Sequence, residues 1–316
     1  MAWVAQRIAI SLVLIWIVTT IVFMAIHLVP GDPAEALLTQ GGMAADPALI
    51  HQLRVDLGLD RPILVQYAGQ LGGMLTGDLG QSMMDGAPVT GLIAQRLGRT
   101  LELIAAAAVL AVVFGLPSGT AAALRQGGWF DRLASGIAAV SMAMPVFVIG
   151  TLLIMLFAQQ LRLMPAGGYV PFLQDPAQHV ILLAMPAITI GVGLIAIVFR
   201  MTRAAVLDVM TRDYVRTARA KGVSRRRVLT RHVIRNALMP VVTVLALHLG
   251  TLLGGTVLVE FVFNWPGLSG LLVDAVNARD YPVVIGVVLT VSILFILLNL
   301  SVELLYGVLD PRSRQT

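Results

Sequence analysis

The chain has 316 residues, of which 58% are hydrophobic and 12% charged, and its mean hydropathy is +0.87. The hydrophobic share exceeds the roughly 45–50% of soluble domains, so the composition favours a protein whose solvent is largely lipid. The net charge is +5, and cysteine is absent, which excludes disulfides, thiol nucleophiles and thiolate metal sites.

Six stretches of 20 residues or more contain no Asp, Glu, Lys or Arg. About 20 apolar residues in a helix cross a hydrocarbon core of roughly 30 Å, and a helix satisfies its own backbone hydrogen bonds in lipid. The sequence therefore predicts an all-α integral membrane protein with six transmembrane helices. The predicted spans are residues 8–30, 103–124, 133–161, 177–199, 236–259 and 281–302.

The first apolar run follows Arg7 and is longer than the roughly 7–15 residues of a signal-peptide core, so we expect a retained helix. The segment at 31–99 then predicts short amphipathic helices outside the membrane. One is expected to begin at Asp46-Pro47 and another at Asp60-Arg-Pro62, ending near the glycine-rich stretch at 72–82. We expect these helices to lie on the membrane face or beneath a partner.

The cations are distributed unevenly between alternate loops. Of the 22 Lys and Arg residues, 16 fall on one side of the predicted membrane and six on the other. The positive-inside rule places the richer side in the cytoplasm. Both termini and the 200–235 segment are therefore expected to be cytoplasmic.

The densest basic segment is DYVRTARAKGVSRRRVLTRHVIRNALMP at 213–240, which holds eight of the 22 cations. Tyr214, Ala218 and Gly222 are spaced four residues apart, so a helix through them would have a small face that lets another surface approach closely. Gly222 is expected to end this helix, and Ser224 to cap the next one.

Arg225, Arg226 and Arg227 fall in the first turn of that next helix, where the macrodipole disfavours each cation by about 0.3–1 kcal/mol. Their position indicates counter-charges supplied from outside the chain. The residues leave two readings open, a polybasic anchor on anionic lipid and a docking surface for an acidic protein. Nucleic-acid binding is disfavoured, because the segment is tied to the membrane and holds one aromatic residue, Tyr214.

DYVRTARAKG at 213–222, followed by RHVIRNALMP at 231–240, resembles the EAA loop of ABC importer permeases, in the branch that serves dipeptides, oligopeptides and related solutes. The family's E-A-A-x-x-x-G frame falls on Arg216, Thr217, Ala218 and Gly222. Other matching pieces are HLVPGDPAEALL at 27–38, GDLGQS at 77–82, PVTGLIAQRL at 88–97 and RDYPVVIG at 279–286.

The resemblance implies a type I ABC importer permease, with residues 1–94 forming the first span and an extracytoplasmic segment, and residues 95–310 the permease core. It implies a second homologous permease, two cytoplasmic ATPases, an extracytoplasmic solute-binding protein, and a place in the bacterial inner membrane. The residues expected to couple to the ATPases are Tyr214, Arg216, Thr217, Ala218, Lys221, Gly222, Arg225 and Arg226. The expected solutes are di- or oligopeptides; the alternative is nickel complexes, glutathione or another small solute.

This chain is not expected to hydrolyse ATP itself. Its single lysine, Lys221, lacks the preceding glycines and the following hydroxyl of a phosphate-binding loop. The five histidines are dispersed, without a second ligand at helical spacing, so no metal site and no cofactor is expected. GVGLIA at 191–196 and GLPSG at 115–119 lie in apolar spans and are expected to pack helices together.

Polar residues within the spans are candidates for a solute path. His248 lies mid-span, Asn299 near the end of the sixth span, and Glu260 just beyond the outer end of the fifth. Because intramembrane polar groups are costly and often functional, these three are predicted pathway or gate positions. Prolines in the spans are either pathway kinks or simple packing bends, and the sequence leaves both open. These prolines are Pro117, Pro145 and Pro186.

Overall fold

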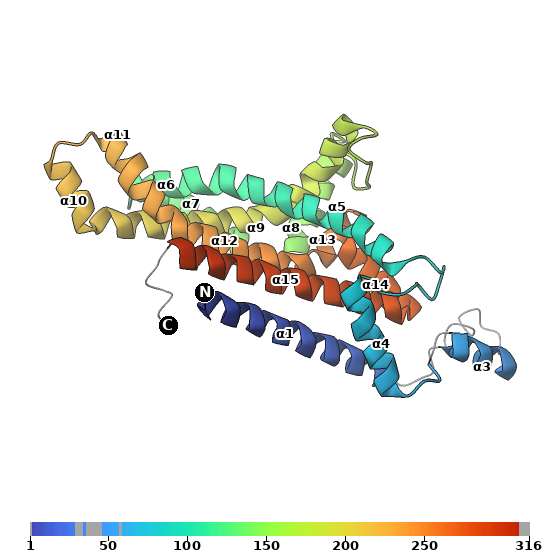
Figure 1. Cartoon of the computed structure of the whole chain (residues 1–316). Helices are drawn as coiled ribbons and strands as arrows, with labels where there is room; N and C mark the ends of the chain where they lie inside the picture. Colours follow the sequence, from blue (N-terminus) through green and yellow to red (C-terminus); the bar gives the residue numbers. More distant parts are fainter. Residues whose placement is uncertain (1, 29–33, 36–45, 57–58, 310–316) are drawn as a thin grey trace. The chain divides into compact units, whose positions relative to one another are not determined.

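The computed structural model describes residues 2–28, 34–35, 46–56 and 59–309, and most of these are helical (Figure 1). The chain divides into two compact units. One comprises residues 1–99, 267–300 and 307–316, and the other residues 100–266 and 301–306. Most of the HLVPGDPAEALL motif and the cations Arg312 and Arg314 lie outside the described residues.

Five of the described helices are long and apolar enough to cross a membrane. A sixth candidate is a pair of helices bent by 103° at a short break. The prediction of an all-helical membrane protein is confirmed, with five spans, or six if the bent pair counts as one. The five are Ala5–Ala25, Val89–Leu124, Pro176–Thr211, Arg225–Gly255 and Tyr281–Ser301, and the pair is Trp129–Ala143 with Val146–Gln160.

The first unit contains both short helices that the sequence predicts. The carboxylate of Asp46 accepts a hydrogen bond from the Ala48 N–H at 2.9 Å, which caps α3. Pro62 precedes α4, which ends before Gly77 in the left-handed conformation. The helices of this unit are α1 (Ala2–His27), α3 (Pro47–Asp56), α4 (Ile63–Thr76), the start of α5 (Val89–Leu110), α14 (Leu268–Ala278) and most of α15 (Tyr281–Leu309).

The second unit is built around the 36-residue helix α9 (Pro176–Thr211). Its other helices are the end of α5, α6 (Leu116–Leu124), α7 (Trp129–Ala143), α8 (Val146–Leu153), α10 (Asp213–Ala220), α11 (Arg225–Arg227), α12 (Arg235–Gly255) and α13 (Val257–Val262). Three π-helical stretches join or extend them, at Ala111–Gly115, Ile154–Gln160 and Val228–Ile234. α9 packs against α6, α7, α8 and α12.

Glycines allow α6 to lie close to α9. A Cβ atom on Gly115 would lie 2.8 Å from the Cβ of Val198, and one on Gly119 would lie 2.6 Å from the carbonyl oxygen of Phe199. Real Cβ atoms do not approach so closely, so these positions require glycine. The expectation that GLPSG is a helix-packing pattern is confirmed.

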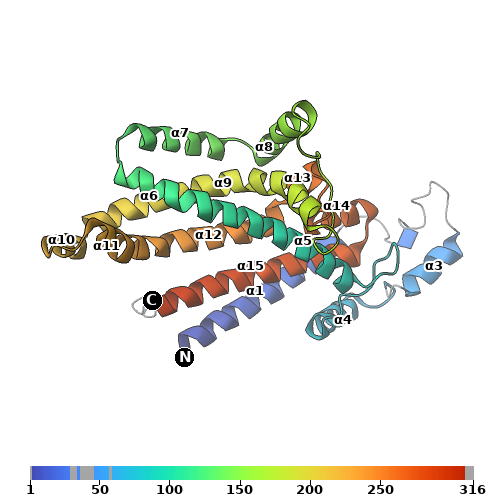
Figure 2. The ribbon, with the colours of Figure 1, turned by 90° about the horizontal axis from the view of Figure 1, so that it is seen from above.

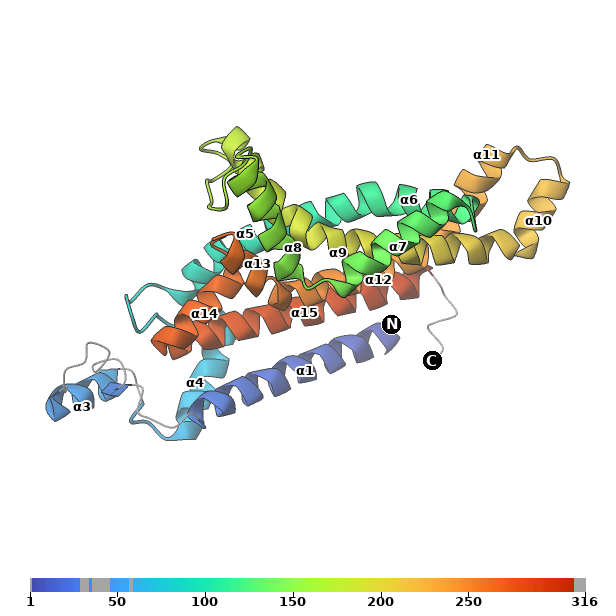
Figure 3. The ribbon, with the colours of Figure 1, turned by 180° about the vertical axis from the view of Figure 1, so that it is seen from behind.

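The third predicted span, residues 133–161, is not one continuous helix. α7 ends before Met144, whose backbone is extended at φ −80° and ψ 129°, and α8 begins after Pro145. Figures 2 and 3 show α8 leaving this point at a steep angle to α7. The residue before a proline is disfavoured in helical conformation, and proline has no N–H to donate. Pro186, by contrast, lies inside the continuous helix α9.

Candidate functional site

The basic segment folds as two short helices, α10 and α11, joined by a tight turn (Figure 1). We call residues 213–227 the coupling loop, after the role that the sequence predicts for them. Gly222 has a φ of +76°, its N–H donates to the Arg219 carbonyl at 3.0 Å, and the Val223 N–H donates to the Ala218 carbonyl at 3.2 Å. This pattern is a Schellman motif, which requires a left-handed residue and favours glycine. The predicted helix end at Gly222 is confirmed.

The inner side of the coupling loop is packed on the chain itself. Val215 is fully buried and Ala218 is 9% exposed. Both belong to an apolar cluster with Val206, Val228 and Val233, which lie on α9 and on the π-helical stretch that leads into α12. The small residue Ala218 therefore allows close packing within this chain, and its side chain is not an open surface for a partner. The cluster holds the loop to the end of α9.

The outer side of the coupling loop carries most of the predicted coupling residues. Tyr214 is 44% exposed, and its hydroxyl accepts a hydrogen bond from the Asn236 side chain at 3.2 Å. The Thr217 hydroxyl donates to the Asp213 carbonyl at 3.0 Å. The exposed members of the predicted set are Tyr214, Arg216, Thr217, Lys221, Gly222, Arg225 and Arg226.

The three consecutive arginines lie in the first turn of the second helix, as the sequence predicts. Ser224 takes the N-cap position with φ −57° and ψ 144°, but its side chain makes no capping hydrogen bond. Arg225, Arg226 and Arg227 are all exposed. The backbone N–H groups and the cations at this helix start therefore present positive charge to the surroundings.

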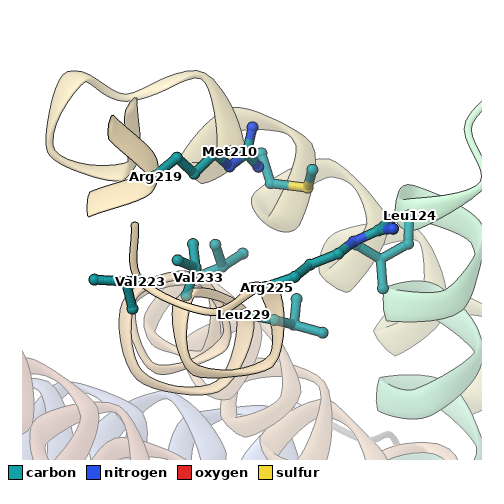
Figure 4. Close-up of a pocket in the computed structure, with 8 residues that line it drawn as sticks. Leu124, Met210, Arg219, Val223, Arg225, Leu229 and Val233 are labelled. Carbon is teal, nitrogen blue, oxygen red and sulfur yellow. The ribbon is translucent and has the colours of Figure 1, made fainter. Parts of the chain in front are cut away.

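A hollow of about 430 Å³ lies between the coupling loop and the ends of α9 and α6. Its walls are mainly apolar, with Met210, Val223 and Leu229 among them. In Figure 4, Arg219 reaches from α10 toward Met210, and Arg225 reaches from the second helix toward Leu124. Two cations at an apolar hollow suit a partner segment with an apolar residue beside a carboxylate.

An ion pair fixes the turn between α6 and α7 to α9. Arg203 donates from Nε to Oδ1 of Asp131 at 2.6 Å and from Nη2 to Oδ2 at 2.8 Å. Oδ2 also accepts the Gly127 N–H at 2.9 Å. The sequence reasoning missed this pair, although an acid at the start of one apolar helix and a base at the end of another were visible signals. The pair steadies the helix that continues into the coupling loop.

The predicted pathway or gate residues have different surroundings. Glu260 on α13 is buried, and its Oε1 accepts hydrogen bonds from the hydroxyls of Thr100 at 2.8 Å and Thr256 at 3.0 Å. His248 on α12 is half-buried, and Asn299 on α15 is half-buried in the other unit. Their roles remain predictions; the geometry makes Glu260 a residue that joins α5 to α13.

Among the residues that the structure describes, no three His, Cys, Asp or Glu side chains are grouped in a way that could hold a metal ion.

Two family models together match nearly the whole sequence. Residues 111–315 match the binding-protein-dependent transport system inner membrane component. Residues 1–104 match the N-terminal model of binding-protein-dependent transport system membrane components.

Curated relatives match over almost their full length. A protein of Escherichia coli strain CFT073, named glutathione transport system permease protein GsiC, is 44% identical over 300 residues, which is 95% of this chain and 94% of that protein. The protein of the same name from Pectobacterium atrosepticum is 44% identical over 298 residues, 94% of each chain. A solved amino acid ABC transporter aligns with a TM-score of 0.47 and 19% identity, over 71% of this chain and 94% of that chain.

Proposed function

Because the chain belongs to the family of binding-protein-dependent transport system inner membrane components, we propose that it is the permease of an ATP-driven importer for glutathione. The chain is a non-catalytic, multi-pass inner-membrane subunit. The observation that carries the choice of solute is the 44% identity, over 95% of this chain, to permeases named for glutathione transport.

This choice revises the order of the solutes expected from the sequence. The sequence put di- and oligopeptides first and glutathione among the alternatives, and the relatives favour the alternative. Glutathione is itself a tripeptide, so the two readings share a backbone amide and charged ends. A permease path needs only weak polar contacts for such a solute, because tight binding would slow its release.

The proposed partners follow from the binding-protein-dependent class. A binding protein delivers the solute on the outer side, a second homologous permease completes the pathway, and two ATPases act at the cytoplasmic face. In this arrangement both termini and the coupling loop are cytoplasmic, in agreement with the 16 cations on that side.

The ATPases are proposed to dock on the outer side of the coupling loop. Support comes from the exposed cations, the hollow bordered by Arg219 and Arg225, and the apolar cluster that holds the loop to α9. A loop so held can transmit a push from an ATPase to α9 as a rigid element. Anionic lipid remains the second reading of the same cations.

Reconstitution tests the solute directly. The permease, its partner permease, the ATPases and the binding protein are placed in proteoliposomes, and ATP-dependent uptake of labelled glutathione, a dipeptide and a nickel chelate is measured in parallel. Glutathione uptake that requires both ATP and the binding protein is the expected result. Uptake of the dipeptide or of nickel, with no uptake of glutathione, would overturn the assignment of solute and leave the class of transporter intact.

A further inference from the structure

Arg200 places a cation beside the apolar part of the second unit. It follows directly after the predicted span 177–199, and it lies on α9 with an exposed side chain. Its Nη1 atom lies 3.3 Å from the sulfur of Met142, near the end of α7. A thioether sulfur is only a weak acceptor, so this contact does little to offset the charge.

The side chain of Arg200 extends away from the charged end of α7. Arg203, one turn further along α9, reaches back to Asp131 at the start of α7. Met142 lies eleven residues beyond Asp131, which is about 16 Å along a helix. Arginines near the ends of spans usually extend toward the headgroup region. The side chain of Arg200 instead extends away from the headgroup region.

The positive charge of Arg200 is not neutralised within the described part of the chain. There, Asp131 is bound by Arg203 through two hydrogen bonds, and no carboxylate lies within ion-pair distance of Arg200. A bare guanidinium facing lipid tails is strongly disfavoured. The surroundings of Arg200 must therefore hold water, a partner or an anion.

A hollow of about 500 Å³ adjoins Arg200 between α7 and α9. Ser135 and Ala139 of α7 and Phe199 and Ala204 of α9 contribute to its walls. The small side chains leave the space open, and the Ser135 hydroxyl and the Arg200 guanidinium supply polar groups. The hollow has room for part of a small solute.

The same region contains the broken helix. Met142 lies two residues before Met144, where α7 gives way to the exposed Pro145. Non-helical backbone at membrane depth is tolerated only where it is buried in protein or lines a water-filled cavity. Transporters place solutes at such discontinuous helices. The break and the inward-reaching cation thus point to the same aqueous space.

We propose that the hollow between α7 and α9 lines the solute path, and that Arg200 attracts a carboxylate of the passing solute. The proposal rests on the proposed function, since glutathione carries two carboxylates and a net negative charge. Arg203 also lines the hollow, but its charge is paired with Asp131. The remaining cation, Arg200, binds a carboxylate weakly in an open hollow, which suits a site that the solute must leave. Arg200 would therefore favour anionic peptides during passage, after the binding protein has selected them.

The first test needs no solute and exploits the absence of cysteine. Ala139→Cys is introduced into the assembled transporter, and its reaction with an anionic and a cationic methanethiosulfonate reagent is measured in membranes opened to both sides. In a water-filled hollow beside Arg200, the anionic reagent should react about tenfold faster, relative to the same pair on a free thiol. Adding Arg200→Gln should abolish this preference. No reaction with either reagent, or a preference unchanged by Arg200→Gln, would overturn the proposal.

The second test measures uptake by Arg200→Gln and Arg200→Lys in proteoliposomes. Arg200→Gln should lower the maximal rate of glutathione uptake by about tenfold or more, while Arg200→Lys keeps most of it because the charge remains. Arg132→Gln is the matched control, since Arg132 is an exposed cation on α7 outside the hollow, and it should leave uptake close to wild type.

The outcomes separate this proposal from the choice of solute. If the wild-type complex imports another peptide instead of glutathione, the proposed function fails, and the reagent preference at Ala139→Cys still decides whether the hollow is aqueous and positive. An Arg200→Gln defect that varies with the anionic lipid content of the vesicles would identify a lipid headgroup as the anion and overturn the solute contact. Equal rates of glutathione uptake by Arg200→Gln and wild type would also overturn the solute contact.

Discussion

Ser82 and Asp280 form a buried hydrogen bond across 198 residues of sequence. The Ser82 hydroxyl donates to Oδ2 of Asp280 at 2.5 Å, and the Met83 N–H donates to Oδ1 at 3.1 Å. Ser82 is 6% exposed and Asp280 is 3% exposed. The contact joins the GDLGQS motif to the RDYPVVIG motif, so two pieces of the family resemblance belong to one structural feature of the first unit.

Replacing Asp280 by alanine should loosen the 77–88 loop. The change removes the acceptor of the buried Ser82 hydroxyl and of the partly buried Met83 N–H, which should lower the free energy of unfolding by about 1–3 kcal/mol. Asp280→Asn should be milder, because the Ser82 hydroxyl can turn and accept from the new amide. Hydrogen exchange at the Met83 amide measures the effect, and equal protection in wild type and Asp280→Ala would contradict it.

Asp85 offers the control for that experiment. Its carboxylate is exposed and accepts the Ala87 N–H at 3.0 Å within the same loop. This backbone hydrogen bond, with one from Ser82, holds the pKa of Asp85 below its ordinary value. Asp85→Asn removes this exposed charge while leaving Asp280 and the Met83 N–H that it accepts in place, so it should leave the exchange of Met83 nearly unchanged.

The ion pair of Asp131 and Arg203 should stabilise the second unit far more than a surface pair does. Asp131 is buried, and Arg203→Gln would leave its carboxylate without its main partner, a cost of about 3–5 kcal/mol for a fully buried pair. Because the Arg203 side chain is partly exposed, we expect the loss of stability to lie at or below the lower end of that range. Thermal unfolding of the purified permease in detergent measures the change.

Arg212→Gln is the matched control for Arg203→Gln. Arg212 pairs with Asp208 at 2.8 Å, but both side chains are about 60% exposed, and the hydrogen bond that Arg212 donates to Asp208 raises the pKa of Arg212. Solvent and salt screen exposed pairs, which contribute little to stability, so the unfolding temperature should barely move. A shift as large as that of Arg203→Gln would show that burial of Asp131 is not the deciding factor.

The features that the sequence predicted depend on local backbone chemistry. Asp46 and Pro62 mark helix starts through a side-chain cap and a fixed φ, and Gly222 ends a helix because it tolerates a positive φ. These effects act within a few residues, so they can be read from the sequence. The spans are predictable for a similar reason, since apolar composition over 20 residues decides them.

The features that the sequence missed depend on packing between distant segments. No sequence feature near Ser82 or Asp280 indicates a partner 198 residues away. Pro145 breaks its helix and Pro186 does not, because neighbouring helices decide whether a proline is accommodated. The spacing of Ala218 predicts a small helix face, but not that this face turns toward the chain's own core.

Gly222→Trp should prevent transport while leaving membrane insertion intact. Gly222 is exposed and a Cβ there would meet nothing within 4 Å, so the permease itself has room for a side chain. A docked ATPase would leave no room for the tryptophan side chain. Gly222→Asn is the matched control, because asparagine tolerates the left-handed conformation and adds less bulk. Wild-type uptake and wild-type co-purification of the ATPase with Gly222→Trp would contradict close docking here.

Replacing Arg225, Arg226 and Arg227 together by glutamine should weaken assembly with the ATPases, and more so at low salt. The three side chains are exposed, and the Debye length is about 10 Å at 0.1 M and 3 Å at 1 M, so high salt already suppresses their attraction in the wild type. Co-purification is measured across that range. A loss of equal size at every salt concentration would indicate a steric or folding effect in place of charge attraction.

The orientation of the chain can be tested with single cysteines, because the sequence contains none. Thr211 lies at the end of α9 beside the coupling loop, and Met84 lies in the 77–88 loop; both are exposed, Met84 by 51%. If the 16 cations mark the cytoplasmic side, a membrane-impermeant maleimide should label Met84→Cys in spheroplasts and Thr211→Cys in inside-out vesicles. Labelling in permeabilised membranes controls for access to each thiol. Reaction of both cysteines from the same face would overturn the topology and, with it, the docking of ATPases on the coupling loop.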